Sequence, residues 1–488
     1  MSGVSKMEKV FAVDIGTRVV KGVIMQKTEN GYSVLASSRE EHSHRAMYDG
    51  QVHDVKEVTK AVLKVKNNLE QKTGEQLKKV AVAAAGRALI TETAHACRQE
   101  PYPIEWKRED ILALEMEALQ NATMKITTPE LSSNSFYCVG YSVIKQYLEG
   151  QEIGSLVGQR GYKAELTLIA TFLPRTVVDG LFSVLEHSNL ELDRLTLEPI
   201  AAGQAAIPRD MRKLNLALVD IGAGTSDIAI TREGSFTSFG MVPMAGDEIT
   251  ETLCEYFLLD FIEGEKIKKD LLNKNEIEIT NFFGNKECFT KNQILDIIKP
   301  TVKNLAERIY QEILLLNQNT SPQAIILVGG GSQTPLLKEF LADISKLSVS
   351  RIGIQTRERL SYISGDEQNL SGADVITPIG IGMAALEGNG LHYYSVLVNN
   401  ISVPILEYRH ATVAEALLAA GIPPRAFIGR PGKALVYFLN DNMKVLKGEL
   451  GKPAKILVNT KPADLDQRIY PNDCIDFTPG CNGNDAKA

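Results

Sequence analysis

Short apolar runs separated by turn residues open the chain. Val10–Val13 and Val19–Met25 are apolar, and a glycine-containing turn at positions 14–17 lies between them. This pattern predicts two strands joined by a tight turn. From Val55 to Leu69 apolar residues recur at spacings of three and four, which predicts an amphipathic helix with Asp54 as its N-cap.

The same arrangement returns in the middle of the chain. Leu216–Val219 and Ile228–Thr231 predict two strands around a second glycine turn, and Ala324–Val328 predicts a buried strand that ends in three glycines. A long helix is expected over Val302–Leu316, with Pro300 near its start. The repetition favours two related α/β halves that close on one ligand.

Two further segments have a different pattern. Between residues 87 and 173 a polar helix, Arg108–Asn121, is mixed with strand-like pieces, as in an inserted subdomain. After residue 388 short strands dominate, interrupted by a helix at Val413–Ala420, which indicates a small β-rich module over residues 389–481. Residues 266–293 read as a polar, lysine-rich stretch, and residues 482–488 read as a frayed tail.

Composition narrows the class of protein. A chain of 488 residues has material for two or more domains. The formal net charge of −7 gives no electrostatic reason to expect nucleic-acid binding. The six cysteines form no CxxC pair, which argues against structural zinc and favours reduced thiols in the cytoplasm. We expect no signal peptide, and the apolar segment Val375–Leu386 is too short to span a bilayer.

The two glycine turns carry the candidate chemistry. Glycines let backbone N–H groups approach phosphate oxygens closely, and nearby hydroxyl groups add donors. Asp14 and Asp220, one at each turn, carry the charge needed to hold a hydrated magnesium ion, and Lys21 can reach back across the first hairpin to a phosphate. Each turn alone could simply be a tight hairpin. The chain has no GxxxxGK[ST] sequence and no early GxGxxG, so P-loop and Rossmann sites are disfavoured.

The order of these segments resembles the actin/heat-shock-chaperone ATPase superfamily. Members have two phosphate hairpins, an adenosine loop and two connecting helices, and Leu197–Gly203 and Ile376–Gly382 resemble the connecting helices. The resemblance covers residues 8–388 and implies an α/β fold with two ribonuclease-H-like domains. It also implies ATP and Mg²⁺ as ligands.

The resemblance assigns roles to individual residues. It implies metal binding by Asp14 and Asp220 and a catalytic role, through the attacking water, for Glu198 together with Asp220. A helix N-terminal acid is the alternative reading of Glu198. The implied nucleotide-binding residues are Asp14, Gly16, Thr17, Lys21, Gly222, Gly224, Thr225, Gly246, Glu265, Lys268, Gly329, Gly330 and Gly331. For Glu265 and Lys268 a solvated helix face is the alternative.

Within the superfamily the chain most resembles the FtsA cell-division proteins, with the PilM pilus-assembly proteins close. The likeness lies in Ala84–Arg87, Glu109–Ala122, Ala164–Leu168 and Leu195–Ala206. It implies a first actin-like domain over residues 1–86 and 174–210, an FtsA-type insertion over 87–173, and a second domain over 211–388 with a subdomain at 247–320. The C-terminal module resembles a β-grasp domain, and we find no basic amphipathic helix of the kind that binds membrane in FtsA.

The resemblance implies a cytoskeletal, ATP-binding division or scaffold protein that self-associates into dimers or filaments, with slow hydrolysis or none. Its partners would belong to a division or envelope-assembly complex, such as an FtsZ-like tubulin homologue, and not to nucleic acids. Its place would be the cytoplasm, at the inner face of the cell membrane, with membrane contact only peripheral or through a partner. The alternatives are a chaperone or reactivase ATPase, a PilM-like assembly protein, a sugar or carboxylate kinase, and an adaptor that binds nucleotide without hydrolysis.

Overall fold

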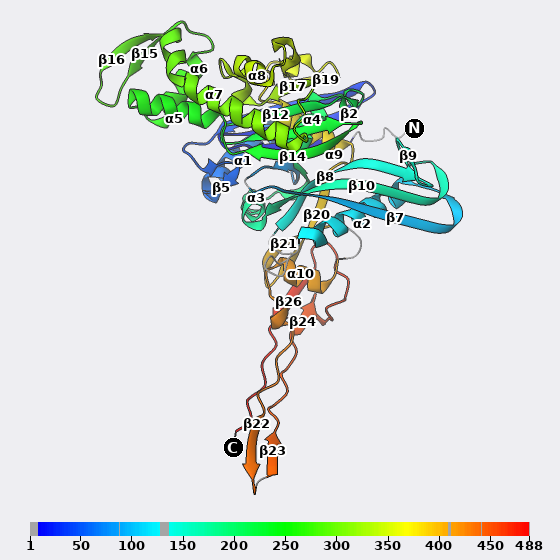
Figure 1. Ribbon diagram of the computed structural model, residues 1–488. Helices are drawn as coiled ribbons and strands as arrows, with labels where there is room; N and C mark the ends of the chain where they lie inside the picture. Colours follow the sequence, from blue (N-terminus) through cyan, green and yellow to red (C-terminus); the bar gives the residue numbers. More distant parts are fainter. Residues whose placement is uncertain (1–7, 87, 127–135, 408–410, 441, 488) are drawn as a thin grey trace. The chain divides into compact units, whose positions relative to one another are not determined.

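The computed structural model describes residues 8–86, 88–126, 136–407, 411–440 and 442–487. It divides into two compact units, residues 1–391 and 392–488. The first unit contains two lobes and an inserted sheet, shown in Figure 1. Arg87, the first residue of the predicted insertion, lies outside the described residues. The finer domain boundaries drawn from the sequence stay predictions.

A mixed sheet forms the first lobe, in the order β19-β3-β2-β1-β6-β11. Its strands are β1 (Lys9–Ile15), β2 (Val19–Thr28), β3 (Gly31–Glu41), β6 (Lys79–Ala84), β11 (Glu191–Leu197) and β19 (Ile363–Ser364). The helices are α1 (Val55–Thr73), α3 (Arg175–His187), α4 (Glu198–Ala206) and α9 (Ile376–Leu386), and a small hairpin is made by β4 (Met47–Tyr48) and β5 (Gln51–Val52). Asp54 caps α1 as predicted, since its side chain accepts a hydrogen bond from the backbone N–H of Glu57.

The second lobe repeats this arrangement in a five-stranded sheet, in the order β14-β13-β12-β17-β18. Its strands are β12 (Leu216–Ile221), β13 (Ser226–Arg232), β14 (Ser235–Val242), β17 (Ala324–Val328) and β18 (Ile352–Ile354). In both lobes an antiparallel three-stranded meander is followed by two parallel strands. The two ribonuclease-H-like halves expected from the sequence are therefore present.

Helices and a hairpin complete the second lobe. They are α5 (Gly246–Phe257), α6 (Phe261–Asp270), β15 (Glu276–Thr280), β16 (Lys286–Thr290), α7 (Lys291–Leu316) and α8 (Leu337–Ser345). One expectation was wrong here. Pro300, expected near the start of the long helix, lies inside α7, because Thr290 and Gln293 form a capping box that starts the helix earlier. The polar stretch 266–293 contains the second half of α6 and the β15–β16 hairpin.

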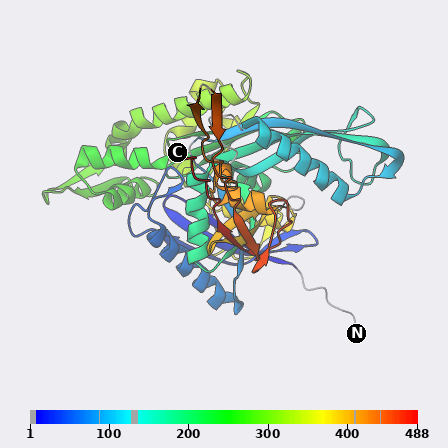
Figure 2. The ribbon, with the colours of Figure 1, turned by 90° about the horizontal axis from the view of Figure 1, so that it is seen from below.

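The insertion between β6 and α3 is a four-stranded sheet with one helix. Its sheet has the order β7-β10-β8-β9, from β7 (Ile90–Glu105), β8 (Phe136–Leu148), β9 (Gln151–Ile153) and β10 (Arg160–Pro174), and its helix is α2 (Arg108–Ile126). Figure 2 shows this blue-to-cyan helix lying along the long strands. The sequence predicted the helix and two of the strands but not β7, whose many polar residues hide it.

The C-terminal unit is built on the sheet β21-β20-β26-β24-β25, in which β20 and β26 run parallel. Its elements are β20 (Leu391–Val398), β21 (Ile401–Leu406), α10 (Val413–Ala419), β22 (Leu435–Leu439), β23 (Asn442–Leu446), β24 (Lys455–Val458), β25 (Lys461–Pro462) and β26 (Cys474–Thr478). The strand-rich composition expected after residue 388 is confirmed, and the β-grasp assignment stays a prediction. The expected frayed tail was wrong, since residues 483–486 make backbone hydrogen bonds to residues 430, 433 and 449.

Candidate functional site

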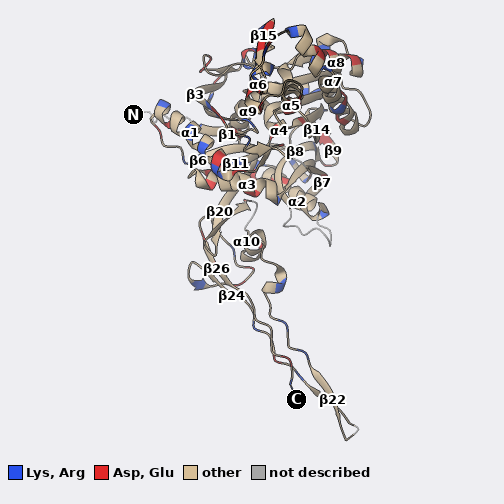
Figure 3. Cartoon of the chain, turned by 90° about the vertical axis from the view of Figure 1, so that its left-hand side faces the viewer, with Lys and Arg blue, Asp and Glu red and all other residues tan. Residues whose placement is uncertain are grey.

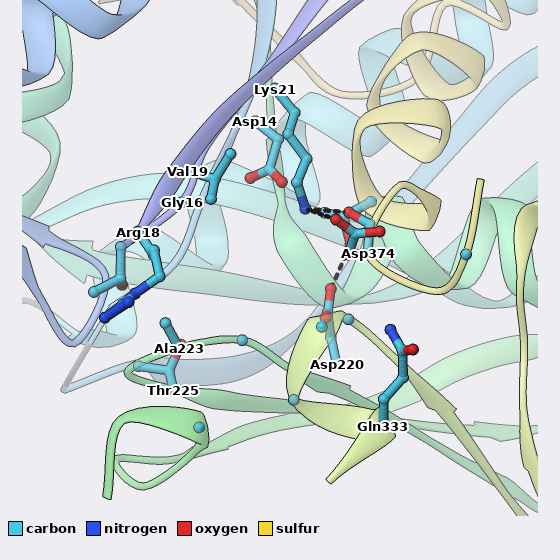
Figure 4. Close-up of a pocket in the computed structure, with 18 of the residues that line it drawn as sticks. Asp14, Gly16, Arg18, Val19, Lys21, Asp220, Ala223, Thr225, Gln333 and Asp374 are labelled. Atoms are coloured by element: carbon cyan, nitrogen blue, oxygen red, sulfur yellow. Dashed lines mark hydrogen bonds and ion pairs between the residues drawn. The ribbon is translucent and has the colours of Figure 1, made fainter. Parts of the chain in front are cut away.

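Residues of both lobes line a polar cavity of about 480 Å³, a volume typical of small-molecule sites. Figure 4 shows it, with Asp14 and Lys21 facing Asp220. The predicted site residues in its wall are Asp14, Gly16, Thr17, Lys21, Glu198, Asp220, Gly222, Thr225, Gly246, Glu265, Lys268, Gly329, Gly330 and Gly331. Gly224 is not among the lining residues. A Cβ atom there would lie 2.9 Å from the backbone nitrogen of Asp49, so this glycine serves a close backbone contact.

The first hairpin places one acid and one base side by side. β1 and β2 are antiparallel, with Asp14 directly opposite Lys21, so both side chains leave the same face of the sheet. The turn is closed by a hydrogen bond from the Gly16 N–H to the Val19 carbonyl, 3.2 Å between N and O. Because Lys21 lies opposite Asp14 in this register, its side chain can reach the same cavity.

The second hairpin has the same geometry and a different charge. Asp220 lies directly opposite Asp227 on β12 and β13, and both side chains are buried. Asp227 accepts a hydrogen bond from the Thr225 hydroxyl, and Asp220 accepts one from Thr377. Burial raises the pKa of Asp227 to about 7, with the charge of Asp220 adding to the effect. Sequence reasoning missed Asp227, although it stands as far after Asp220 as Lys21 does after Asp14.

The glycine run after β17 packs closely against this second hairpin. Gly329 has φ of +80°, and a Cβ atom there would lie 2.3 Å from Asp220 Oδ1. At Gly331 a Cβ would lie 2.6 Å from the Ile221 side chain. A side chain at either position would displace Asp220 or its hairpin, so the backbone of this loop forms the cavity wall directly.

Five carboxyl groups lie close enough to one another to shift the pKa of at least one neighbour. Burial raises the pKa of Asp14 to about 6 against the attraction of Lys21, with Asp220 and Asp374 adding repulsion. Burial also holds the pKa of Glu198 well above its usual range, with Asp14, Asp227 and Asp220 adding repulsion. Lys21 Nζ lies 3.0 Å from Asp374 Oδ2. This part of the cavity therefore contains more carboxyl groups than the single charge of Lys21 can neutralise.

The opposite wall carries an acid–base pair on α6. Lys268 Nζ lies 2.7 Å from Glu265 Oε2 and donates to the Gly246 carbonyl and the Thr250 hydroxyl, each at 2.8 Å. Burial alone would raise the pKa of Glu265, but Lys268 and Arg18 together bring it below its usual value. These contacts join α6 to the start of α5 at the cavity edge.

Several lining residues had no counterpart in the sequence reasoning. Arg18, Arg39, Asp374 and Thr377 are among them. Arg18 packs its guanidinium 4.5 Å from the centre of the Phe261 ring, and Arg45 does so on the same ring at the same distance. Because Arg18 directly follows the predicted site residue Thr17, its position in the cavity wall could have been predicted from the sequence. Asp374 enters the site only through the fold.

The donor set fits a nucleotide with magnesium. Mg²⁺ prefers oxygen ligands and is usually held by one or two carboxylates together with water and substrate phosphates. Asp14 and Asp220 supply carboxylate oxygens in a place where a divalent cation would relieve their mutual repulsion. Across the described residues no cluster of three or more His, Cys, Asp or Glu side chains could enclose a metal.

Comparison with known proteins agrees with this architecture. A model of the family "Cell division protein FtsA" matches residues 217–378. The FtsA protein of Bacillus subtilis is 23% identical over 351 residues, which cover 70% of this chain and 78% of that protein. The FtsA protein of Escherichia coli K12 is 22% identical over 341 residues, covering 66% and 79%. The solved PilM–PilN type IV pilus biogenesis complex contains a chain of the same fold, with a TM-score of 0.56, 15% identity and coverage of 77% and 98%.

Two duplicated sheets around a glycine-lined polar cavity define a protein of the actin fold. Within that fold its sequence is similar to the FtsA cell-division proteins. In the described part of the chain no helix is long and apolar enough to cross a membrane.

Proposed function

We propose that this chain is an ATP-binding, actin-like protein of the FtsA type that acts in cell division. The observation that carries the proposal is that Asp14 and Asp220 line one cavity, whose wall is formed by two glycine turns and a glycine run. ATP would bind there with its phosphates at the two turns, on backbone N–H groups, Thr17, Thr225 and Lys21. Asp14 and Asp220 would hold Mg²⁺, which neutralises phosphate charge when bound.

The adenosine part would lie between the glycine run and α6. Gly329–Gly331 leave room for close approach, while Glu265 and Lys268 present a fixed acid and base at the same cavity. The Gly246 carbonyl accepts a hydrogen bond from Lys268 and lies at the same side of the cavity. The contacts of Lys268 hold the pair in place, so little side-chain ordering would be needed on binding.

Hydrolysis, where it occurs, would be slow. Glu198 begins α4 and lines the cavity, and burial, with repulsion from Asp14, Asp227 and Asp220, raises its pKa and so favours its protonated form. A protonated carboxyl cannot accept a proton from water. Turnover would therefore require that repulsion among these carboxyl groups is reduced, so that Glu198 can ionise. Nucleotide would then act mainly as a switch of assembly state.

The proposed partners are other copies of this chain and proteins of a division complex, such as an FtsZ-like tubulin homologue, at the cytoplasmic face of the cell membrane. A PilM-like role in envelope assembly is the second candidate, favoured by the fold likeness. A chaperone or reactivase role would require rapid turnover with an unfolded or inactive protein client.

The test is sedimentation and electron microscopy of purified protein with Mg·ATP, with Mg·ADP and without nucleotide. The expected result is ATP binding with weak turnover and assemblies that appear with one nucleotide state. Rapid turnover stimulated by a client protein, without assemblies, would contradict the proposal and favour a chaperone.

A further inference from the structure

An unusual three-stranded stalk extends from the core of the C-terminal unit. Residues 429–433, 448–452 and 480–486 run side by side and exchange backbone hydrogen bonds, such as Gly432 N–H to the Glu449 carbonyl (2.8 Å) and Gly483 N–H to the Arg430 carbonyl (2.8 Å). Figure 1 shows these three segments winding around one another, with β22 and β23 beyond them.

Each stalk segment contains two glycines three positions apart. The six are Gly429, Gly432, Gly448, Gly451, Gly480 and Gly483, and a Cβ atom on any of them would lie 1.9–2.7 Å from the backbone of a neighbouring segment. The same rule holds at the axis of collagen, where only glycine fits. The stalk is therefore a closely packed spacer and not a loose loop.

The hairpin at the end of this spacer has one wholly apolar face and one mixed face. In the β22–β23 register Val436 pairs with Val445 and Phe438 with Met443, which gives one face made only of apolar side chains. The other face carries Leu435, Leu439 and Leu446 beside Tyr437, Lys444 and Asn442. Phe438 is 73% exposed and Met443 63% exposed.

Basic residues surround the apolar hairpin. Across the stalk and the hairpin (residues 428–452 and 480–486) the sequence has five basic residues (Arg430, Lys433, Lys444, Lys447 and Lys452) and three acidic ones, whereas the whole chain has a net charge of −7. Figure 3 shows blue basic positions along the stalk. An apolar surface with a basic surround is complementary to an anionic lipid surface.

We propose that the β22–β23 hairpin binds the surface of an anionic bilayer, with Val436, Phe438, Met443 and Val445 against the acyl boundary. Five-residue strands are about 17 Å long, too short to cross a core of about 30 Å. Open strand edges are not tolerated in hydrocarbon, and Asn440 and Asn442 make the turn polar, so the hairpin lies in the interface. The inference deepens the proposed membrane location and does not require nucleotide binding.

The test is co-sedimentation of the full chain with vesicles of equal parts phosphatidylglycerol and phosphatidylcholine, and with phosphatidylcholine alone. Binding is expected to the anionic vesicles and to fall at least tenfold in the double variant Val436→Ser/Phe438→Ser. Lys444→Gln and Lys447→Gln should each weaken binding about fivefold and reduce its salt dependence. Phe282→Ser is the matched control, since Phe282 is 85% exposed beyond β15 and should not matter.

Asp220→Asn separates the two proposals, because vesicle binding must persist in it even where ATP binding is lost. Equal binding of wild type and the double variant would overturn the inference. So would a double variant that leaves vesicle binding unchanged but lowers the sedimentation coefficient without lipid, since the apolar face would then be a contact between copies. Circular dichroism of each variant checks that the fold is kept.

Discussion

Asp227 lies directly opposite Asp220 in the β12–β13 pair, at the place that Lys21 occupies opposite Asp14 in the first lobe. The duplicated hairpins thus present a carboxyl–lysine pair on one side and two carboxyl groups on the other. This asymmetry concentrates negative charge in a buried site and leads to a prediction about pH.

Stability without magnesium should fall as pH rises from about 4 to about 7. Asp227 has a folded-state pKa of about 7 and Asp14 one of about 6, both above the unfolded value near 4. The folded state therefore binds more protons in this window, and its advantage is lost as pH passes through the folded pKa values. Thermal unfolding across this range measures the slope. Asp227→Asn should flatten it, and an unchanged slope would show that other groups control it.

Lys21→Ala should weaken ATP binding about 10–100-fold, because a charge-assisted contact to phosphate contributes about 1.5–3 kcal/mol. Lys21 Nζ lies 3.0 Å from Asp374 Oδ2, and both residues line the cavity. Calorimetric titration with ATP measures the change. Lys9→Ala is the control, because Lys9 pairs with Glu75 at the surface, and an equal loss in both variants would refute a direct role.

Gly380→Ala should destabilise the first unit. Gly380 lies in α9 against α4, and a Cβ atom there would lie 1.8 Å from the Ala201 carbonyl oxygen. Overpacking of this kind costs about 1–3 kcal/mol. Gly154→Ala is matched to it, since a Cβ at Gly154 meets nothing within 4 Å. Thermal melting should drop for the first variant alone, and similar melting of both would mean that the helices separate easily.

Glu198→Gln should lower ATP turnover by about a hundredfold while leaving ATP affinity little changed, because a positioned general base contributes about 10²–10⁴. Phosphate release under single-turnover conditions measures the rate. If turnover survives the substitution, Glu198 serves as the N-terminal acid of α4 and nothing more.

Local patterns predicted what depends on neighbouring residues in the chain. Both glycine hairpins, the cap at Asp54 and the glycine run after β17 were readable, because turns and caps require particular residues at fixed offsets. Asp374 and the packing of Arg18 and Arg45 on Phe261 were not, since only the fold brings these segments together. The stalk glycines were visible as residues, but their period has meaning only when three distant segments meet.

We infer that Asp14 and Asp220 hold magnesium with ATP in this cavity. Calorimetric titration of ATP into wild type and Asp14→Asn, each with and without Mg²⁺, tests it most directly. We expect Mg²⁺ to strengthen ATP binding at least tenfold in wild type, roughly 1.4 kcal/mol, and little in the variant. No ATP binding by wild type, or an equal effect of Mg²⁺ in both proteins, would contradict it.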